Sequence, residues 1–351
     1  MAEPHYQQLT PDRVLDAVET CGLRCDGRQY ALNSYENRVY QVWLEDVSMR
    51  VAKFYRPQRW SDAAILEEHA YSQETAEREI PVVAPLSING KTLHEHGGFR
   101  FALFPKQGGR APELDRPEVL QWIGRFMGRI HAVGAIKPFR QRPRIDLAGF
   151  GEAPSRYVLD NGFVPVDLKP AYAAIVRDAL AGVRACYSDA GKVQDIRLHG
   201  DCHAGIVLWT DAGPHFVDFD DCRSGPAVQD LWMLLSGDRE AMAGQLADVL
   251  RGYREFRKFD LRELRLIEAL RTLRARGYAP RILHTCNSGG LVQHPSLHLD
   301  MVRPGLLVYG VERVVLVKVD ESGPYLSARV RTLAAPDDSS RETEALTLAI
   351  V

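Results

Sequence analysis

The sequence predicts an α+β protein of two lobes, a small one built on a mixed β-sheet and a larger, mainly helical one, followed by a β-rich tail of foreign character. Three observations lead to this prediction. The first hundred residues alternate strand-like and helix-like patterns, the middle of the chain has apolar residues at helical spacing, and the pattern changes after residue 274. We therefore expect domains over residues 1–107, 108–274 and 275–351.

The small lobe, residues 1–107, is expected to hold a sheet and one long helix. Strands are predicted by two runs rich in apolar and β-branched residues, YALNSYENRVYQVWLE and VSMRVAKFY. The helix is predicted by SDAAILEEHAYSQETAEREI, with Ser61 or Asp62 as its N-cap. Asn89 and Gly90 stand between apolar flanks, which is typical of a hairpin turn and adds strands to the sheet.

The second lobe, residues 108–274, follows a glycine-rich connector, KQGGRAP. Apolar residues at i, i+3, i+4 and i+7 predict helices in EVLQWIGRFMGRIHAVGAI, LKPAYAAIVRDALAGVRACYSDA, GPAVQDLWMLLSG and REAMAGQLADVLRGYREF. Beyond residue 274 the chain becomes β-rich and turn-rich, and APDDSSRETE is predicted to be a polar linker.

Composition restricts the classes of function. The 351 residues carry a net charge of −2, so binding to nucleic acid through phosphate neutralisation is not indicated. Because no run of about 18 apolar residues occurs, we expect no membrane span. The six cysteines are too irregular for a disulfide framework and the N-terminus lacks the pattern of a signal peptide, so a reducing cytoplasm is expected. The oligomeric state is left open.

Two acidic sites lie close together in the sequence. Asp201 follows HG in a tight loop, and Asp218 ends the apolar run HFV. Kinase-type phosphoryl transfer needs one carboxylate that takes the proton of the acceptor hydroxyl and another that holds Mg²⁺ against the nucleotide phosphates. A turn-capping role for Asp201 and a strand-end role for Asp218 would explain each residue alone, but the pair favours phosphotransfer.

An upstream lysine suits the same chemistry. Lys53 lies on a predicted strand that precedes the helix with Glu67 and Glu68, so it is the candidate that binds ATP phosphates while a helix carboxylate holds its ammonium group. We expect that carboxylate to be Glu68; the alternative is an edge-strand lysine beside two solvated glutamates. Ser34 lies in the polar turn NSYEN, which either contacts phosphate or is an ordinary hairpin turn.

Six segments, in order along residues 8–274, resemble the aminoglycoside-phosphotransferase and choline-kinase superfamily and, within it, bacterial stress-response Ser/Thr protein kinases: LNSYENRVYQ, KFYRPQRW, ILEEH, HGDCHAG, VDFDD and GPAVQDLWMLL. The resemblance implies a bilobal protein-kinase-like fold and Mg²⁺-dependent transfer of the γ-phosphoryl group of ATP to a protein serine or threonine. It also implies roles for single residues: a nucleotide contact for Ser34, phosphate binding for Lys53, the catalytic base for Asp201 and the metal ligand for Asp218. We expect the nucleotide between the lobes, near residues 104–108.

One position departs from the superfamily pattern. Five residues after Asp201, where the pattern has a metal-binding Asn, the chain has Ile206, which cannot ligate a cation. Asp220 or Asp221 could replace part of this coordination if a carboxylate turns inward. We expect strongly reduced activity with nucleotide binding retained.

Other polar residues near this loop are given supporting roles. His199, Cys202 and His203 lack a second ligand pair, so we expect the histidines to pack the loop rather than to bind a metal. Asp230 is expected to accept hydrogen bonds from backbone N–H groups and to brace the loop.

The tail resembles a different family. Residues 278–312 are similar to a short internal piece of alanine racemase, a pyridoxal-phosphate enzyme, in which Asn287 and Ser288 would match a phosphate contact and Arg303 the arginine that faces the pyridine nitrogen. The segment with the Schiff-base lysine has no counterpart, so this fragment is not expected to form a cofactor site.

Three alternatives to the protein kinase remain. A small-molecule kinase acting on an aminoglycoside, choline or a sugar would use the same residues. A pseudokinase that binds nucleotide without transfer is supported by Ile206. A pyridoxal-phosphate racemase is the weakest of the three.

Overall fold

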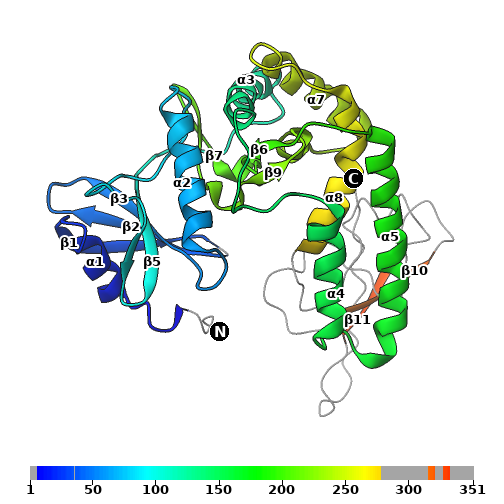
Figure 1. Ribbon diagram of the computed structural model, residues 1–351, viewed down its shortest axis with the longest axis horizontal. Coiled ribbons are helices and arrows are strands. Elements are labelled where there is room, and N and C mark those ends of the chain that lie inside the picture. The colour runs from blue at the N-terminus through cyan, green and yellow to red at the C-terminus, as the bar shows by residue number, and fades with distance from the viewer. Residues whose placement is uncertain (1–5, 35, 278–314, 321–326, 333–351) are drawn as a thin grey trace. The chain divides into compact units, whose positions relative to one another are not determined.

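The structure is a computed structural model, and it describes residues 6–34, 36–277, 315–320 and 327–332 (Figure 1). By their contacts the residues form two compact units, Met1–Gly149 with Gly182–Arg271 and Phe150–Ala181 with Thr272–Val351. The predicted boundary between residues 107 and 108 lies inside the first unit, which therefore contains parts of both predicted lobes.

The first unit begins with a five-stranded sheet. Its strands, in the order in which they pair, are β1 (Cys25–Leu32), β2 (Arg38–Leu44), β3 (Met49–Phe54), β5 (Phe99–Pro105) and β4 (His94–His96). All four neighbouring pairs are antiparallel, rather than mixed as expected, because β1, β2 and β3 follow one another through short loops and β4 turns directly into β5. The Asn89–Gly90 turn is confirmed by the bridge between Ile88 and Lys91.

Side-chain alternation gives the two faces of this sheet different partners. Ala52 and Phe54 of β3 belong to the apolar core that includes helix α1 (Pro11–Glu19). Lys53 lies between them in the sequence and points to the opposite face, where Ala102 of β5 packs with Ile65 of helix α2 (Asp62–Ala76). The period of two in a strand therefore directs this lysine towards α2.

Helix α2 begins where the sequence predicts. Ser61 is the N-cap, and its side chain accepts a hydrogen bond from the backbone N–H of Ala64 at 3.2 Å. Figure 1 shows α2 running beside the sheet. The helix thus presents Glu68 to the face that carries Lys53.

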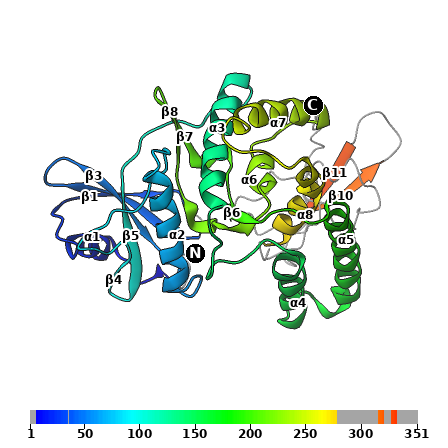
Figure 2. The same cartoon turned by 45° about the horizontal axis from the view of Figure 1, so that its top comes forward.

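The rest of the first unit is built on two crossing helices, α3 (Pro117–Gly134) and α7 (Arg239–Tyr253), which Figure 2 shows beside the short strands. They approach closely because glycines lie at the crossing: a Cβ on Gly252 would lie 2.0 Å from the carbonyl oxygen of Gln121. The remaining elements are β6 (Ile196–Leu198), η4 (Ala204–Ile206), β7 (Val207–Thr210), β8 (Gly213–Phe216), η5 (Phe219–Asp221), β9 (Arg223–Gly225), α6 (Val228–Trp232), η6 (Leu261–Leu266) and the start of α8 (Ile267–Gly277).

The helix predicted in GPAVQDLWMLLSG is shorter than expected. Only α6, five residues long, is helical; it ends at Trp232, and the chain turns at Gly237, whose φ is +92°, before Asp238 caps α7. The other three predicted helices are confirmed.

The second unit contains η2 (Ala148–Glu152) in part, α4 (Ala153–Asp160), η3 (Val166–Leu168), the first part of α5 (Lys169–Ala190) and the strands β10 (Val315–Asp320) and β11 (Ser327–Thr332). The two strands pair antiparallel, from Val315 opposite Thr332 to Asp320 opposite Ser327. Asn287, Ser288 and Arg303 lie outside the described residues. Within the described ranges, no helix is long and apolar enough to cross a membrane.

Candidate active site

Lys53 is the central cation of the candidate site. Its side chain is only 6% exposed, and its Nζ lies 3.2 Å from Oε1 of Glu68, 3.0 Å from Oδ1 of Asp218 and 3.3 Å from Oδ1 of Asp220. The structure thus brings together four residues that the sequence singled out, from β3, α2 and the acidic segment after β8, residues 217–221.

The surrounding charges decide the protonation state of Lys53. Burial alone would lower its pKa, but the carboxylates of Asp218, Asp220 and Glu68 outweigh burial and raise the pKa well above its ordinary value. Lys53 is therefore an ammonium group at physiological pH. Such a fixed charge suits the binding of an anion.

The two glutamates of α2 have different roles. Glu68 is buried and reaches Lys53, as the sequence reasoning expected. The carboxylate of Glu67 instead accepts hydrogen bonds from the backbone N–H groups of residues 140, 141 and 142 at 2.7, 2.7 and 3.0 Å. Glu67 thus binds backbone N–H groups and is not directed at the lysine.

Asp201 lies in the loop between β6 and η4, beside His203. Oδ2 of Asp201 is 3.7 Å from Nε2 of His203. Burial lowers the pKa of His203, and the nearby charges of His199 and Asp218 act on it in opposite directions. Asp201 is therefore paired with His203, whose pKa also responds to the charge of Asp218.

The loop that carries Asp201 is fixed by buried hydrogen bonds. Asp230 of α6 accepts from the backbone N–H groups of His199 and Gly200, each at 2.8 Å, which confirms its predicted bracing role. His199 packs the loop as expected: its Nε2 lies 2.9 Å from the carbonyl oxygen of Val217, and its ring lies against Phe219 with centroids 4.4 Å apart. Since that oxygen can only accept, Nε2 carries the proton.

Gly200 allows this loop to approach the acidic segment. Its φ is +86°, and a Cβ there would lie 2.1 Å from the carbonyl oxygen of Asp221. A side chain would therefore be both strained and in collision with backbone. Because Gly200 has no side chain, the HGD segment can lie against the backbone of the VDFDD segment.

The acidic segment divides its carboxylates between two environments. Asp218 has a left-handed backbone, φ +60° and ψ +65°, and its side chain is 56% exposed. Asp220 is buried, and Arg59 donates to it as well as to Asp221, the latter at 2.9 Å. Burial would raise the pKa of Asp220, but Lys53, Arg59 and Arg142 lower it to about 2.

The surroundings of Ile206 show what lies where the family pattern has a metal-binding asparagine. Ile206 is buried at the end of η4, and its carbonyl oxygen accepts from the N–H of Val217 at 3.1 Å, so the position adjoins Asp218. Asp220 is held by Arg59 and Lys53, and Asp221 by Arg59 and Arg223. Both carboxylates that were considered as replacements for the missing asparagine are therefore paired with cations, and a metal-binding role for either stays a prediction.

The residues present fit a magnesium ion only in part. Among the described residues there is no group of three or more His, Cys, Asp or Glu side chains that could hold a metal ion. Asp218 offers a partly exposed carboxylate, and kinase sites bind Mg²⁺ through one or two carboxylates together with phosphate oxygens. Asp218 therefore fits a metal that a nucleotide helps to hold, and the side chain of Ile206 offers no second ligand.

The polar turn before β2 adjoins the same segment. Ser34 lies half-buried in this turn. Asn37 is buried there; its Oδ1 accepts from the backbone N–H of Arg56 at 3.1 Å, and its side chain contributes to lowering the pKa of Asp220. The turn that carries the predicted nucleotide contact is thus connected to the acidic segment.

Sequence reasoning missed three residues of this site. Arg142 and Arg59 reach the acidic segment from distant parts of the chain, and His131 of α3 binds Asp230 at 3.0 Å and Tyr253 at 3.0 Å. No local periodicity marks the two arginines, because they lie in irregular segments. His131 falls on the apolar face of a predicted helix, which is the only signal that could have pointed to it.

Family models match two parts of the chain. The phosphotransferase enzyme family (APH) matches residues 29–267, and the alanine racemase N-terminal domain matches a short stretch, residues 253–313. The first match contains every residue of the site described above. The second confirms the racemase-like fragment predicted from the sequence.

Sequence relatives agree with the first match. The chain is 46% identical over 269 residues to stress response kinase A of Escherichia coli strain K12, with 77% of this chain and 81% of the relative covered. It is 44% identical, with the same coverage, to the serine/threonine protein kinase RdoA of Salmonella typhimurium strain LT2.

Solved structures share the fold. An amicoumacin kinase in complex with AMP-PNP, Ca²⁺ and Ami is similar with a TM-score of 0.63 and 18% identity, covering 82% of this chain and 92% of the other. A microcompartment-associated aminopropanol kinase gives a TM-score of 0.60 and 15% identity, covering 81% and 93%. These similarities confirm the predicted fold class and, at such identities, nothing beyond the fold.

Proposed function

The chain belongs to the phosphotransferase enzyme family, and on this premise we propose that it is an ATP- and Mg²⁺-dependent kinase whose acceptor is a serine or threonine hydroxyl of a protein. The observation that supports this most is the ammonium group of Lys53, buried and held among Glu68, Asp218 and Asp220 at 3.0–3.3 Å. Phosphoryl transfer depends mainly on positioning and on stabilising charge, and this arrangement provides a fixed positive charge for phosphate oxygens.

We assign the proton transfer to Asp201. Its carboxylate lies beside His203 at the edge of the loop that Asp230 fixes, and a carboxylate at this place can accept the proton of an acceptor hydroxyl. The rigid loop keeps the carboxylate at one distance from the phosphate site. Ser34 is proposed to contact the nucleotide from the turn before β2.

We assign metal binding to Asp218, the exposed carboxylate of the acidic segment. When bound, Mg²⁺ neutralises charge on the transferred phosphate. Lys53 lies 3.0 Å from Asp218 and would place the nucleotide phosphates next to it. Because Ile206 supplies no oxygen, the metal is held by fewer protein ligands, and slow transfer is expected.

The protein acceptor is proposed from the names of the sequence relatives, stress response kinase A and serine/threonine protein kinase RdoA. Solved structures with the same fold are small-molecule kinases, which keeps a small alcohol as the second candidate acceptor. We place the activity in the cytoplasm, where ATP is available and thiols such as the five free cysteines of the described residues stay reduced.

The test is transfer of labelled γ-phosphate from MgATP, measured for this chain and for Ile206→Asn, with myelin basic protein and with a panel of small alcohols. We expect both proteins to bind ATP. Ile206→Asn should transfer at least about 10-fold faster, since even outer-shell partners of a metal contribute about 10–100-fold. Ile136→Asn, at an exposed position outside the site, is the control and should leave the rate unchanged.

Each result separates the candidates. Transfer to the protein substrate supports a protein kinase, and transfer to an alcohol alone supports a small-molecule kinase. Binding of ATP by both proteins with transfer by neither supports the pseudokinase to which Ile206 points. If neither protein binds ATP, the proposed function is wrong.

A further inference from the structure

Arg142 connects helix α2 with the acidic segment. The guanidinium group is fully buried and uses all three of its nitrogens. Nε donates to the carbonyl oxygen of Ala64 at 2.8 Å, Nη2 donates to Oε2 of Glu68 at 2.8 Å, and Nη1 donates to the carbonyl oxygen of Asp220. One planar guanidinium group therefore connects the backbone of α2, the side chain of Glu68 and the backbone of the acidic segment.

Glu68 is thus held by two cations, one on each oxygen. Oε1 faces Lys53 at 3.2 Å and Oε2 faces Arg142 at 2.8 Å. A carboxylate with only the lysine as a partner could rotate about its terminal bond, whereas one fixed at both oxygens cannot. Arg142 therefore sets the direction from which Glu68 meets Lys53.

The segment that carries Arg142 is anchored at both ends. Before Arg142, the carboxylate of Glu67 accepts three consecutive backbone N–H groups, including that of Arg142 at 3.0 Å. After it, Ile145 donates to the carbonyl oxygen of Ser224 at 2.8 Å, in β9. Residues 140–145 thus form a connection between α2 and the strand that follows the acidic segment.

We propose that Arg142 and Glu67 are positioning residues for phosphate binding: Glu67 fixes the backbone of residues 140–142, and Arg142 then orients Glu68 and, through it, Lys53. The proposal rests on the proposed function, since it assumes that Lys53 receives the phosphates of ATP. In this proposal, neither residue contacts the nucleotide. Both act on the lysine that does.

The test compares the affinity for ATP with the affinity for adenosine, which has no phosphates, by calorimetry on the full chain. In Arg142→Lys, a single ammonium cannot make the three directed hydrogen bonds, so Glu68 loses its second partner. We expect the affinity for ATP to fall about 10-fold or more, while the affinity for adenosine changes less than about twofold. Glu67→Gln, which retains one of the two acceptor oxygens, should give a smaller fall of the same kind.

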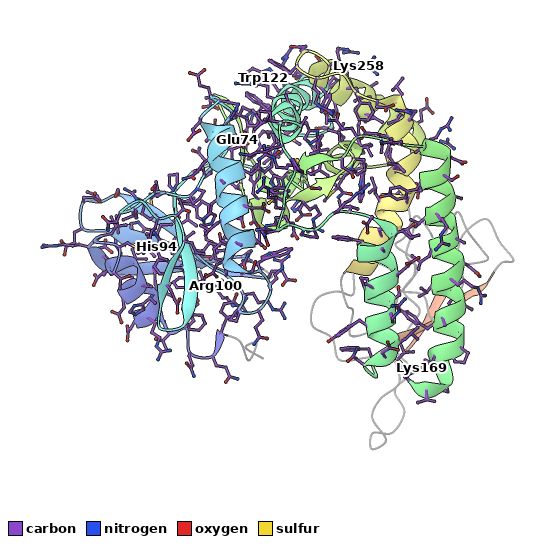
Figure 3. The ribbon with its side chains drawn as sticks, in the orientation of Figure 1. Glu74, His94, Arg100, Trp122, Lys169 and Lys258 are labelled. Carbon is purple, nitrogen blue, oxygen red and sulfur yellow. The ribbon has the colours of Figure 1, made fainter. Side chains whose placement is uncertain are left out.

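Arg197→Lys is the matched control for a buried arginine. The side chain of Arg197 is 2% exposed and binds Glu74 at 2.9 Å and the carbonyl oxygen of Val133 at 2.8 Å, away from Lys53. Glu74 is labelled on α2 in Figure 3. This variant should lower the melting temperature as Arg142→Lys does, but it should leave the ratio of ATP to adenosine affinity unchanged.

A double variant tests whether Arg142 acts through Glu68. If it does, Arg142→Lys added to Glu68→Gln changes the ATP-to-adenosine ratio little further, because the group that it positions is already altered. The proposal would be overturned if Arg142→Lys lost affinity for ATP and for adenosine equally, or if it lost no affinity for ATP. A wild-type chain that binds adenosine but gains nothing from the phosphates would refute the proposed function and the positioning roles together, whereas a normal wild type with an unaffected variant refutes the positioning roles alone.

Discussion

At the scale of single residues, the candidate site is governed by the distribution of charge around Lys53. Three carboxylates face this ammonium group, yet they are not equivalent, because Asp220 and Glu68 are buried while Asp218 is largely exposed. Each buried carboxylate also has an arginine partner: Arg59 pairs with Asp220, and Arg142 pairs with Glu68. The site therefore leaves one carboxylate, Asp218, directed towards solvent and available to a metal.

The role of Asp201 can be tested by a near-isosteric change. Asp201→Asn keeps the size of the side chain but cannot accept a proton, so ATP affinity should stay within about twofold while transfer falls by about 100-fold or more. Transfer is best measured in the Ile206→Asn chain, where the wild-type rate is expected to be higher. Asp211→Asn, in the exposed turn between β7 and β8, is the control; phosphorylation that continues unchanged in Asp201→Asn would remove the assignment.

At the scale of elements, the loop with Asp201 depends on a short helix. Asp230 of α6 holds the loop, and the start of α6 is in turn held by Glu263 of η6, which accepts from the N–H of Val228 at 2.9 Å. Burial raises the pKa of Glu263 to about 7, although the hydrogen bond from Val228 and the charge of Arg257 act against burial.

This pKa makes the stability of the chain depend on pH. Because the folded state favours the protonated carboxyl, the contribution is fully present below the ordinary pKa of 4.5 and is lost as the pH rises through about 7. Glu263→Gln has no carboxylate to ionise, so its melting temperature should fall less between pH 5 and pH 8 than that of the wild type. By linkage the difference is about 3 kcal/mol at most.

Circular dichroism melts at the two pH values would measure this difference. The exposed Glu240, in the first turn of α7, gives the matched control, since Glu240→Gln should keep the wild-type pH dependence. The assignment to Glu263 fails if Glu263→Gln shows the same fall in melting temperature as the wild type.

At this scale, sequence patterns predict most helices and strands but not their pairing. The strands, the helix α2 with its cap at Ser61 and the helices α3, α5 and α7 follow from periodicity and capping, which are local properties. The short α6 and the antiparallel sheet were not predicted correctly, because they depend on turns and on strand pairing. Periodicity does not distinguish Glu68 from Glu67, because both lie on α2, and only packing shows their different partners.

At the scale of the whole molecule, the residues of the site belong to one compact unit. Met1–Gly149 and Gly182–Arg271 contain every residue to which a role is assigned here, and the phosphotransferase family match ends at residue 267. The alanine racemase match covers residues 253–313, so it overlaps the first match over residues 253–267 and continues into the tail. Most of the first unit is therefore related to phosphotransferases, whereas the match that continues into the tail is to a different family.

Deletion of residues 276–351 tests whether the tail takes part in nucleotide binding. Since no assigned residue lies in it, ATP affinity should stay within about threefold, whereas soluble yield should change more, because removing the tail alters the apolar surface. Calorimetry with ATP and the soluble fraction after expression are the measurements. A loss of ATP affinity of more than about tenfold would show that the tail is integrated with the site.

The sequence by itself determined the family resemblance, the order of the chemical groups and the departure from the family pattern at Ile206, because residue identity within short segments is sufficient for these. Only the tertiary structure decided which carboxylates are neutralised. Arg59 and Asp220 are 161 residues apart in the chain, and Arg142 and Glu68 are 74 apart. Such pairs depend on the path of the chain through space and on burial, which strengthens charge interactions, and neither leaves a local pattern in the sequence.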